Sequence, residues 1–381
     1  MRFILLFGLV SFFADMTYEG ARSINGAYLA ILGANGVIVG FIAGFGELIG
    51  YSFRLFSGYL VERNKKYWPM TFVGYAFNLF AVPLIALTHT WPFAALLMII
   101  ERLGKGTRIP SRDTMLSYAA KNVGPGWGFG LHEAMDRGGA MVGTLLITAL
   151  VASGMALNHS FGWLAIPAIL AFIVLATTAF LFRSPKDLQP KVEDLQLQGI
   201  PPSFWKYLVA SAFVAAGYAD FALIAYHVQK TSIFTTAMIP LAYAFALGLQ
   251  AIAAPILGRL YDRFDLKVLA FALLAGTLFA PLVFLGGSFF VALGILLWAF
   301  GVGAQESLMR PIIAGMVGSD KRASAYGIYY LVYGISWFLG SLTMGLLYDY
   351  SLPLLAVFAM FSQLFAAVWL MTKCRSLVSR F

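Results

Sequence analysis

"GYLVERNKK" at residues 58–66 follows a long apolar stretch and returns about 200 residues later as "GRLYDRFDLK" at residues 258–267. In both copies a glycine precedes an acid–arginine pair, and a basic residue follows. A second match joins "GFGLHEAMDRGGAMVG" (128–143) to "AYGIYYLVYGISWFLG" (325–340). The two matches occur in the same order and are separated by nearly the same number of residues, which indicates a duplicated unit. The paired positions are Gly58 with Gly258, Glu62 with Asp262, Arg63 with Arg263, Gly130 with Gly327, and Gly143 with Gly340.

The composition indicates that the chain folds in a lipid bilayer. Of its 381 residues, 60% are hydrophobic and only 11% are charged, whereas a soluble domain carries about 25% charged residues. A transmembrane helix needs about 20 mostly apolar residues, and the chain has twelve such stretches, which predicts an all-α membrane protein. Their expected bounds are 3–32, 37–62, 68–88, 92–118, 127–155, 161–183, 204–230, 234–260, 267–286, 289–315, 323–349 and 352–373.

The first apolar run is expected to be a membrane helix. Only Arg2 precedes it, and the run continues well past residue 12, so it does not match the short core of a signal peptide. The single cysteine, Cys374, excludes an internal disulfide framework and any zinc-ribbon spacing.

Lysine and arginine gather in the loops of one side, whereas "GAN", "THTW", "LNHSFG" and "GGS" on the other side have almost none. Because cytoplasmic loops are enriched in these residues, both termini are expected in the cytoplasm, with the chain in a prokaryotic inner membrane. The net charge of +9 is thereby explained without a nucleic-acid partner. The long polar segment at 183–203 indicates a linker. The expected domains are a six-helix bundle at 1–183, a cytoplasmic linker at 184–203 and a second six-helix bundle at 204–381.

The two copies at 58–66 and 258–267 resemble the signature that follows the second helix of each half in the major facilitator superfamily of secondary transporters. Glu62 stands where that signature has aspartate, and Asn64 where it has glycine. The resemblance covers essentially the whole chain and implies twelve helices in two six-helix bundles. It also implies a conformational latch formed by Gly58, Glu62, Arg63, Gly258, Asp262 and Arg263.

Two further stretches are similar to motifs of this family. "ERLGKGTRIP" (101–110) is similar to the fourth-helix motif, with Arg102 at the arginine and Gly106 at the helix-packing glycine. "DRGGAMVG" (136–143) is similar to the glycine-rich antiporter motif of the fifth helix, although Gly139 stands where proline is common. Both resemblances favour export.

Charged residues inside predicted membrane helices need a functional or structural explanation, because each costs several kcal/mol unless it faces water or a partner. The first helix carries Asp15, Glu19 and Arg22 on one stripe, and the fourth repeats this pattern from Glu101 to Arg112. The resemblance implies that the first, fourth, seventh and tenth helices line a central cavity. The candidate substrate- and proton-binding residues are Asp15, Glu19, Arg22, Glu101, Arg102, Lys105, Arg108, Asp136, Asp220 and Glu306.

Ion pairs within a membrane can also serve only to fix the registry of helices. This structural interpretation is preferred for the charged residues near the predicted cytoplasmic ends, which are Glu133, Arg137, Arg112 and Asp113. Glu47 and Arg54, seven residues apart on the second helix, fit a structural pair and a gating contact equally well.

The leading hypothesis is a proton-coupled secondary transporter that works by alternating access and exports a small organic solute. Burial disfavours the charged form of a carboxyl group and a nearby arginine favours it, so alternating access can make one acid bind and release a proton. The candidates for this proton are Asp15, Glu19, Glu101 and Asp136. The expected partners are a small-molecule substrate, protons and the lipid bilayer, and the expected state is a monomer.

Two other transporter hypotheses remain open. One is divalent metal efflux similar to that of ferroportins, with Asp15, Glu19 and His227 as oxygen and imidazole ligands. The other is uptake of an organic anion held by Lys105, Arg108 and Arg22. An enzyme is not expected, because no set of nucleophile, base and orienting group is evident in the sequence, and no cofactor motif is present. A channel would not need the duplicated latch motif.

Overall fold

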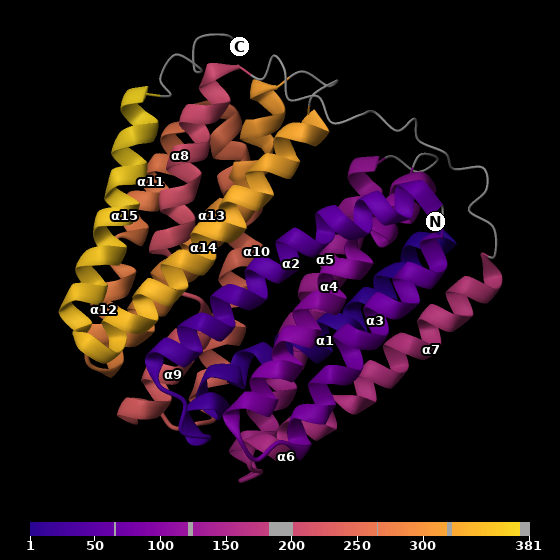
Figure 1. The fold of residues 1–381 in the computed structure, drawn as a ribbon, viewed down its shortest axis with the longest axis horizontal. Coiled ribbons are helices and arrows are strands. Elements are labelled where there is room, and N and C mark those ends of the chain that lie inside the picture. The colour runs from indigo at the N-terminus through magenta and orange to yellow at the C-terminus, as the bar shows by residue number, and fades with distance from the viewer. Residues whose placement is uncertain (65, 121–124, 183–200, 265, 318–321, 374–381) are drawn as a thin grey trace. The chain divides into compact units, whose positions relative to one another are not determined.

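The computed structural model describes residues 1–64, 66–120, 125–182, 201–264, 266–317 and 322–373, and these ranges contain helices and short connections but no strand (Figure 1). The elements are α1 (Arg2–Ile31), α2 (Gly36–Asn64), α3 (Tyr67–Leu84), η1 (Ile85–Leu87), α4 (Trp91–Ala120), α5 (Pro125–Ala152), α6 (Leu157–Trp163), α7 (Ala165–Leu181), α8 (Pro202–Gly217), α9 (Phe221–Thr231), α10 (Met238–Phe264), α11 (Leu266–Gly276), α12 (Phe279–Leu285), α13 (Ser288–Met316), α14 (Arg322–Tyr350) and α15 (Leu352–Lys373).

Helices occupy each of the twelve predicted stretches, which confirms the all-helical membrane class. Within the described ranges, eleven spans are long and apolar enough to cross a membrane. The twelfth stretch is α4, which is not among them because the charged residues from Glu101 to Asp113 lower its hydropathy. The arrangement as twelve spans in two six-helix bundles therefore remains a prediction. Most of the predicted linker lies outside the described residues.

Four of the predicted spans are interrupted rather than continuous. The seventh is divided into α8 and α9, where the carboxylate of Asp220 accepts a hydrogen bond from the backbone nitrogen of Ala222 (3.0 Å) and caps α9. The third passes from α3 into the 3₁₀ helix η1 close to Pro83, a residue that lacks the N–H group needed to continue an α-helix. The sixth and ninth are divided into α6 with α7 and α11 with α12.

Large apolar side chains cover much of the exterior of the helices. Leu87 and Phe289 are each 73% exposed, and Phe93 and Phe245 are each 66% exposed. A water-soluble protein rarely exposes apolar patches of this extent. Exposed apolar side chains of this kind occur on nearly all the long helices, which is consistent with a lipid-facing surface.

Two compact units make up the chain, and each is described by itself. Unit 1 comprises Met1–Ala34, Phe45–Val192 and Thr235–Ala244, whereas unit 2 comprises Asn35–Gly44, Glu193–Phe234 and Phe245–Phe381. The first turns of α2 thus belong to unit 2, and the first turns of α10 belong to unit 1. The predicted domain bounds remain a prediction.

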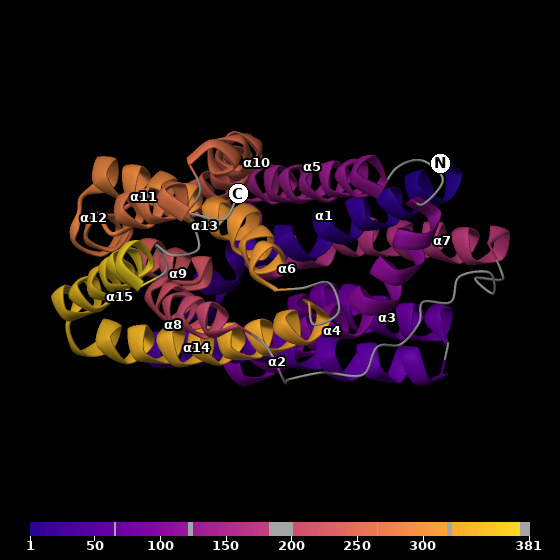
Figure 2. The same cartoon turned by 90° about the horizontal axis from the view of Figure 1, so that it is seen from above.

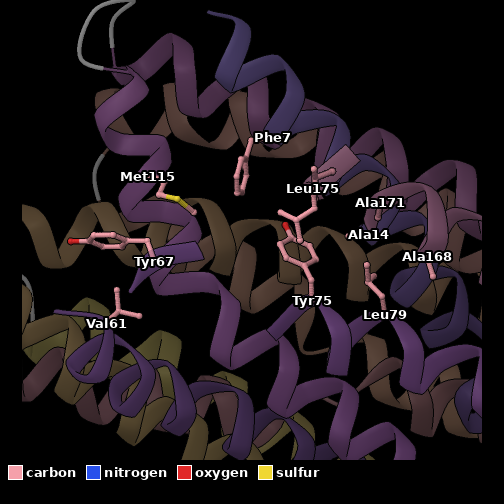
Figure 3. Close-up of a cluster of buried hydrophobic side chains, with 11 residues drawn as sticks. Phe7, Ala14, Val61, Tyr67, Tyr75, Leu79, Met115, Ala168, Ala171 and Leu175 are labelled. Atoms are coloured by element: carbon pink, nitrogen blue, oxygen red, sulfur yellow. The ribbon is translucent and has the colours of Figure 1, made fainter. Parts of the chain in front are cut away.

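The apolar core of unit 1 lies between α1, α3, α4 and α7. Phe7, Tyr75, Leu79, Met115 and Leu175 are all almost completely buried in it (Figure 3). Because lipid tails are as apolar as these side chains, close van der Waals packing rather than removal from water holds such helices together. The fit between neighbouring helices therefore decides which polar residues meet.

The closest helix contact in unit 1 joins α1 and α5, which lie side by side (Figure 2). A Cβ atom on Gly139 would overlap the carbonyl oxygen of Phe12, and one on Gly143 would overlap that of Met16. Residue numbers rise together along this contact, so the two helices run parallel. The small residues of the predicted fifth-helix motif thus allow the two backbones to approach each other.

Replacing Gly143 by alanine is expected to force α1 and α5 apart and to lower the stability of the protein by about 1–3 kcal/mol. Gly248→Ala is the matched control, because no atom lies within 4 Å of the added methyl group. Thermal unfolding in detergent measures both variants. Equal midpoints for the two variants would show that the α1–α5 contact tolerates an additional methyl group.

The latch residues lie in the last turns of α2 and α10. Arg63 and Arg263 are both exposed, and the Arg263 guanidinium lies 5.3 Å from the centre of the Phe264 ring. A methyl group added to Gly58 would face Pro110 of α4, whereas one added to Gly258 would have no neighbour within 4 Å. The side chains of Glu62 and Asp262 lie outside the described set, so the latch remains a prediction.

Candidate functional site

A cluster of buried charges lies within unit 1 on α1, α2, α4 and α5. Glu19, which is 8% exposed, is its centre. Its Oε1 atom lies 3.7 Å from Arg22 Nη1 and 3.8 Å from Lys105 Nζ. Its Oε2 atom accepts a hydrogen bond of 2.7 Å from the hydroxyl of Tyr243, in the first turns of α10. The cluster therefore includes a residue far away in sequence that sequence reasoning missed.

Glu47 on α2 connects the first helix to the fourth. Its Oε1 atom lies 3.1 Å from Arg22 Nη2 and 3.3 Å from Arg102 Nη1. Glu47 and Arg54 do not form the structural pair that was one of the two interpretations, since Glu47 forms its ion pairs with bases on other helices. The Arg54 guanidinium instead lies 4.8 Å from the centre of the Tyr51 ring. The gating contact remains a prediction.

Glu101 is held from two directions. Its Oε2 atom lies 3.4 Å from Arg102 Nε, and its Oε1 atom accepts a hydrogen bond of 2.7 Å from the amide nitrogen of Asn78 on α3. Gly74 and Gly104 permit this approach, because α3 and α4 pack backbone to backbone there. Glu101 is thus tied into the bundle interior.

Arg108 is fully buried between aromatic rings. It donates a hydrogen bond of 3.0 Å to the hydroxyl of Tyr75, and its guanidinium lies 4.4 Å from the centre of that ring. Lys105 Nζ lies 4.0 Å from the centre of the Tyr18 ring. Cation–π contacts of this kind stabilise a cation that has lost its water. Tyr18 and Tyr75 therefore supply part of the solvation of these two bases.

Asp15 differs from the other acids of the cluster. It is 6% exposed, its Oδ1 atom has no hydrogen-bond partner, and it forms no ion pair with the described residues. It interacts electrostatically with Asp136, Lys105, Arg108 and Glu19. Asp15 is therefore a buried carboxyl group near both signs of charge without a fixed counter-ion.

Ser11, His132 and Asp136 form a line of side chains, of which Ser11 is the member that sequence reasoning missed. The hydroxyl of Ser11 lies 2.8 Å from His132 Nε2, and His132 Nδ1 lies 3.6 Å from Asp136 Oδ2. The same Oδ2 atom lies 3.7 Å from Arg112 Nη1. The order resembles a nucleophile, base and orienting acid, but Ser11 is fully buried in the α1–α5 contact. A substrate carbonyl therefore has no access to Ser11 in this structure.

The candidates in the second half of the chain lie in unit 2. Asp220 caps α9, and Glu306 is exposed on α13. His227 Nδ1 lies 3.0 Å from the hydroxyl of Tyr348. Among the described residues, no group of three or more His, Cys, Asp or Glu side chains is arranged to hold a metal ion. The ligand set proposed for metal efflux therefore gains no support.

Replacing Tyr243 by phenylalanine removes the hydroxyl that binds Glu19 Oε2. The expected loss of stability is about 1–2 kcal/mol, because a hydrogen bond to a charged group is stronger than a neutral one and hydrogen bonds between membrane helices contribute up to about 2 kcal/mol. Tyr59→Phe is the control, since Tyr59 is 61% exposed. Thermal unfolding of the two variants should differ, and identical midpoints would mean that the Tyr243 contact contributes nothing.

The cluster holds acidic and basic side chains in nearly equal number within apolar membrane helices. It contains five acids (Asp15, Glu19, Glu47, Glu101 and Asp136) and five bases (Arg22, Arg102, Lys105, Arg108 and Arg112), and a sixth acid, Asp113, pairs with Arg112 at 2.8 Å with a side chain that is 42% exposed. The side chains of Arg22 and Lys105 are still 20% and 18% exposed, so the cluster borders accessible space. A compact polar cluster that reaches accessible space inside membrane helices is typical of a membrane transporter.

Comparisons with known proteins agree with this class. The family profile of the Major Facilitator Superfamily matches residues 210–376. An uncharacterized protein of Mycobacterium tuberculosis is 36% identical over 374 residues, which cover 96% of this chain and 91% of the relative. An uncharacterized MFS-type transporter of Methanocaldococcus jannaschii is 24% identical over 360 residues, covering 91% and 89%. The chain belongs to the major facilitator superfamily and is a multi-pass membrane transporter, as the sequence resemblance predicted.

Solved structures show the same fold. The nucleoside transporter NupG is similar with a TM-score of 0.77 and 15% identity, covering 100% of both chains. A POT family transporter in complex with a thioalcohol-conjugated peptide is similar with a TM-score of 0.79 and 12% identity, covering 99% of this chain and 97% of that one. At these identities the likeness concerns the fold.

Proposed function

We propose that the chain is a proton-coupled secondary transporter that exports a small organic solute by alternating access, with both termini in the cytoplasm of a prokaryotic cell. The observation that carries this proposal is Asp15, a buried carboxyl group without a fixed counter-ion. Such a group can hold a proton in one state of the protein and release it in another, because its charge depends on which bases and how much water it faces.

The surroundings of Asp15 supply that dependence. Asp15 interacts electrostatically with two bases, Lys105 and Arg108, and with two acids, Asp136 and Glu19. Any movement of α4 relative to α1 changes the balance between these charges. Glu19 is less suited to carry the proton, because three partners already hold its charge.

The ion pairs of the cluster bear on the substrate. Arg22 and Lys105 both pair with Glu19, so an organic anion would have to compete with that carboxylate for them. This favours a neutral, zwitterionic or cationic organic solute over an organic anion as the cargo. The glycine-rich contact of α5 and Arg102 of α4 support export, as their resemblance to the antiporter and fourth-helix motifs implies.

The test is a screen in liposomes that contain the purified protein and a pH-sensitive dye. A panel of small organic solutes and divalent metal ions is added one at a time, and solute-induced proton movement is recorded. We expect at least one organic solute to move protons in opposition to its own movement. Proton movement caused by metal ions alone would overturn the organic-solute proposal in favour of metal efflux, and solute flux without proton movement would overturn proton coupling.

A further inference from the structure

We propose that Gln305 and Trp337 form a solute-binding site within unit 2, and that this site takes a planar, uncharged ring carrying a hydrogen-bond acceptor. A ring nitrogen or a ring carbonyl would supply that acceptor. The inference rests on the proposed function and names a class within the neutral, zwitterionic and cationic solutes that it favours. Gln305 lies on α13 and Trp337 on α14, whereas the charged cluster belongs to unit 1.

A row of aromatic side chains on α14 faces α13. Tyr329, Tyr333 and Trp337 follow one another at steps of four residues, and the centres of neighbouring rings lie 5.5 and 5.8 Å apart. The Tyr333 hydroxyl donates a hydrogen bond of 2.8 Å to Gln305 Oε1, and the Tyr329 hydroxyl lies 3.6 Å from Met309 Sδ. The row thus packs against one amide and one thioether, which are also four residues apart.

Two hydrogen-bond donors in this arrangement lack an acceptor. Gln305 Nε2 and Trp337 Nε1 have no hydrogen-bond partner in the part of the chain that the structure describes. The two residues are only 5% and 8% exposed, and buried polar groups in native proteins are nearly always hydrogen-bonded. Gln305 Oε1 already accepts from Tyr333. A group that satisfies the two remaining atoms must therefore be an acceptor.

The side chains around these donors select a flat and uncharged group. Gln305, Tyr333 and Trp337 carry no charge, and burying a charged group without a counter-ion is costly. Aromatic rings attract one another in stacked or edge-to-face arrangements with centres about 4.5–7 Å apart. A conjugated ring next to Trp337 gains such a contact and presents an acceptor at the same time. An aliphatic acceptor gains only the hydrogen bond, and a hydrocarbon ring gains only the ring contact.

The buried row continues into rings that are accessible. The centre of the Tyr330 ring lies 5.4 Å from that of Tyr329, and the centre of the Tyr326 ring lies 6.3 Å from that of Tyr330. Tyr326 and Tyr330 are half-buried, whereas Tyr329 is 4% exposed. A flat ring can therefore reach the buried part of the row by exchanging one aromatic contact for the next.

Two helix contacts occur in both halves of the chain and align them. The first joins α5 to α1 and recurs between α14 and α8, and the second joins α4 to α2 and recurs between α13 and α10. In each contact a glycine lies against the backbone of the other helix, and corresponding glycines are separated by the same number of residues. The corresponding contacts are Gly143 with Met16 and Gly340 with Ala216, and Gly106 with Gly50 and Gly303 with Gln250.

The same offset aligns polar residues of α4 and α5 with those of α13 and α14. Arg108 corresponds to Gln305, and Asp136 corresponds to Tyr333. Both positions are charged in the first half and uncharged in the second, although they are buried in both halves. Unit 2 thus has an amide and a phenol, which suit an uncharged group, at the positions where unit 1 carries charges.

The experiment is a titration of the protein in lipid nanodiscs at constant pH, followed by nuclear magnetic resonance of nitrogen-labelled tryptophan. Of the eight indole N–H signals, the one that disappears in Trp337→Phe belongs to Trp337. Two probes, quinoline and caffeine, are planar and uncharged and have ring acceptors. Naphthalene is quinoline without its nitrogen, and N-methylpyrrolidone has a carbonyl but no aromatic ring. Trp205→Phe is the matched control, since Trp205 is 48% exposed in the same unit.

We expect quinoline and caffeine to move the Trp337 signal downfield in a saturable manner, because an acceptor at an indole N–H deshields its proton. Naphthalene and N-methylpyrrolidone should leave this signal in place at the same concentrations. Gln305→Met keeps the length of the side chain but removes its donor. Both probes should therefore bind about three- to tenfold more weakly, which is the usual effect of one hydrogen bond. Trp205→Phe should bind them as the wild type does.

Tyr333→Phe provides a second variant if Gln305→Met does not fold. It removes only the hydroxyl that holds Gln305 Oε1, so the amide loses its fixed orientation. Quinoline and caffeine should again bind more weakly and move the Trp337 signal less at the same concentration.

A Trp337 signal that neither quinoline nor caffeine moves would overturn the site. An equal shift with naphthalene would overturn the need for an acceptor, and equal affinities of the wild type and Gln305→Met would overturn the role of Gln305. The titration uses no pH gradient, so its outcome is independent of proton coupling. Probe binding without solute-induced proton movement would support the site while the proposed function failed, and proton-coupled transport without probe binding would overturn the site alone.

Discussion

Replacing Asp15 by asparagine is expected to reduce pH-driven solute transport to the level of protein-free liposomes. Asparagine has nearly the same shape and cannot exchange a proton, so it removes the coupling without creating a cavity. Since Asp15 forms no ion pair with the described residues, its neutralisation leaves no base without its fixed partner. We therefore expect the protein to insert and fold normally and to retain downhill movement of the solute.

The controls for this variant separate coupling from folding. Glu133→Gln removes an acid whose pair with Arg137 is exposed, and it should transport like the wild type. Glu19→Gln should lower transport for a different reason, because it leaves Arg22 and Lys105 without a shared carboxylate. If Asp15→Asn and Glu19→Gln both kept full pH-driven transport, the first helix would not carry the proton.

Replacing Arg102 by alanine is expected to destabilise unit 1 by about 3–5 kcal/mol, which is the usual cost of removing one partner from a buried ion pair. Arg102 lies 3.3 Å from Glu47 and 3.4 Å from Glu101, and its side chain is only 13% exposed. Its loss leaves Glu101 with the amide of Asn78 and the more distant charge of Lys105. The measurement is the thermal unfolding midpoint and the yield of folded protein.

Arg137→Ala is the matched control for Arg102. Its ion pair with Glu133 has a similar length of 3.0 Å, but the side chains are 31% and 61% exposed. Exposed pairs of this kind contribute about 0–1 kcal/mol. Equal losses of stability in the two variants would contradict the view that burial, rather than pairing itself, gives the cluster its importance. Arg102→Lys should be intermediate, because lysine keeps the charge but not the two-pronged geometry.

The sequence was sufficient to predict the helices and the family. The apolar length of a stretch and the residues of each motif are properties of a single segment, so the sequence alone reveals them. The structure places helices in all twelve stretches. The sequence also predicted that Asp15, Glu19 and Arg22 share one face of the first helix, because spacings of four and three residues place side chains on one face whatever the surroundings.

The contacts between side chains on different helices could not be predicted from the sequence in the same way. Ser11 meets His132 121 positions away, and Tyr243 meets Glu19 224 positions away. Such pairs depend on the rotation and level of each helix, which the backbone contacts of Gly139 and Gly143 determine. A serine or tyrosine in a membrane helix gives no sign of which neighbour it will meet. The spacing of four residues between His132 and Asp136 could be seen in the sequence, but no sequence pattern indicated that Ser11 would contact His132.

Asp220 shows the converse difficulty. An acid in a predicted membrane span indicates a functional site, yet its carboxylate caps α9 at a break that apolar length does not reveal. A break in the helix leaves backbone N–H groups without partners, and an aspartate at that point satisfies one of them. The candidate role of Asp220 in substrate binding therefore remains a prediction beside this structural role.

The measurement that tests the central claim most directly is solute accumulation in proteoliposomes under an imposed pH gradient, with the wild type and Asp15→Asn reconstituted side by side. The proposal predicts that the wild type accumulates an organic solute against its own gradient, that reversing the pH gradient reverses the movement, and that Asp15→Asn equilibrates the solute without accumulating it. Accumulation that is equal in both proteins, or solute movement that ignores the direction of the pH gradient, would contradict it.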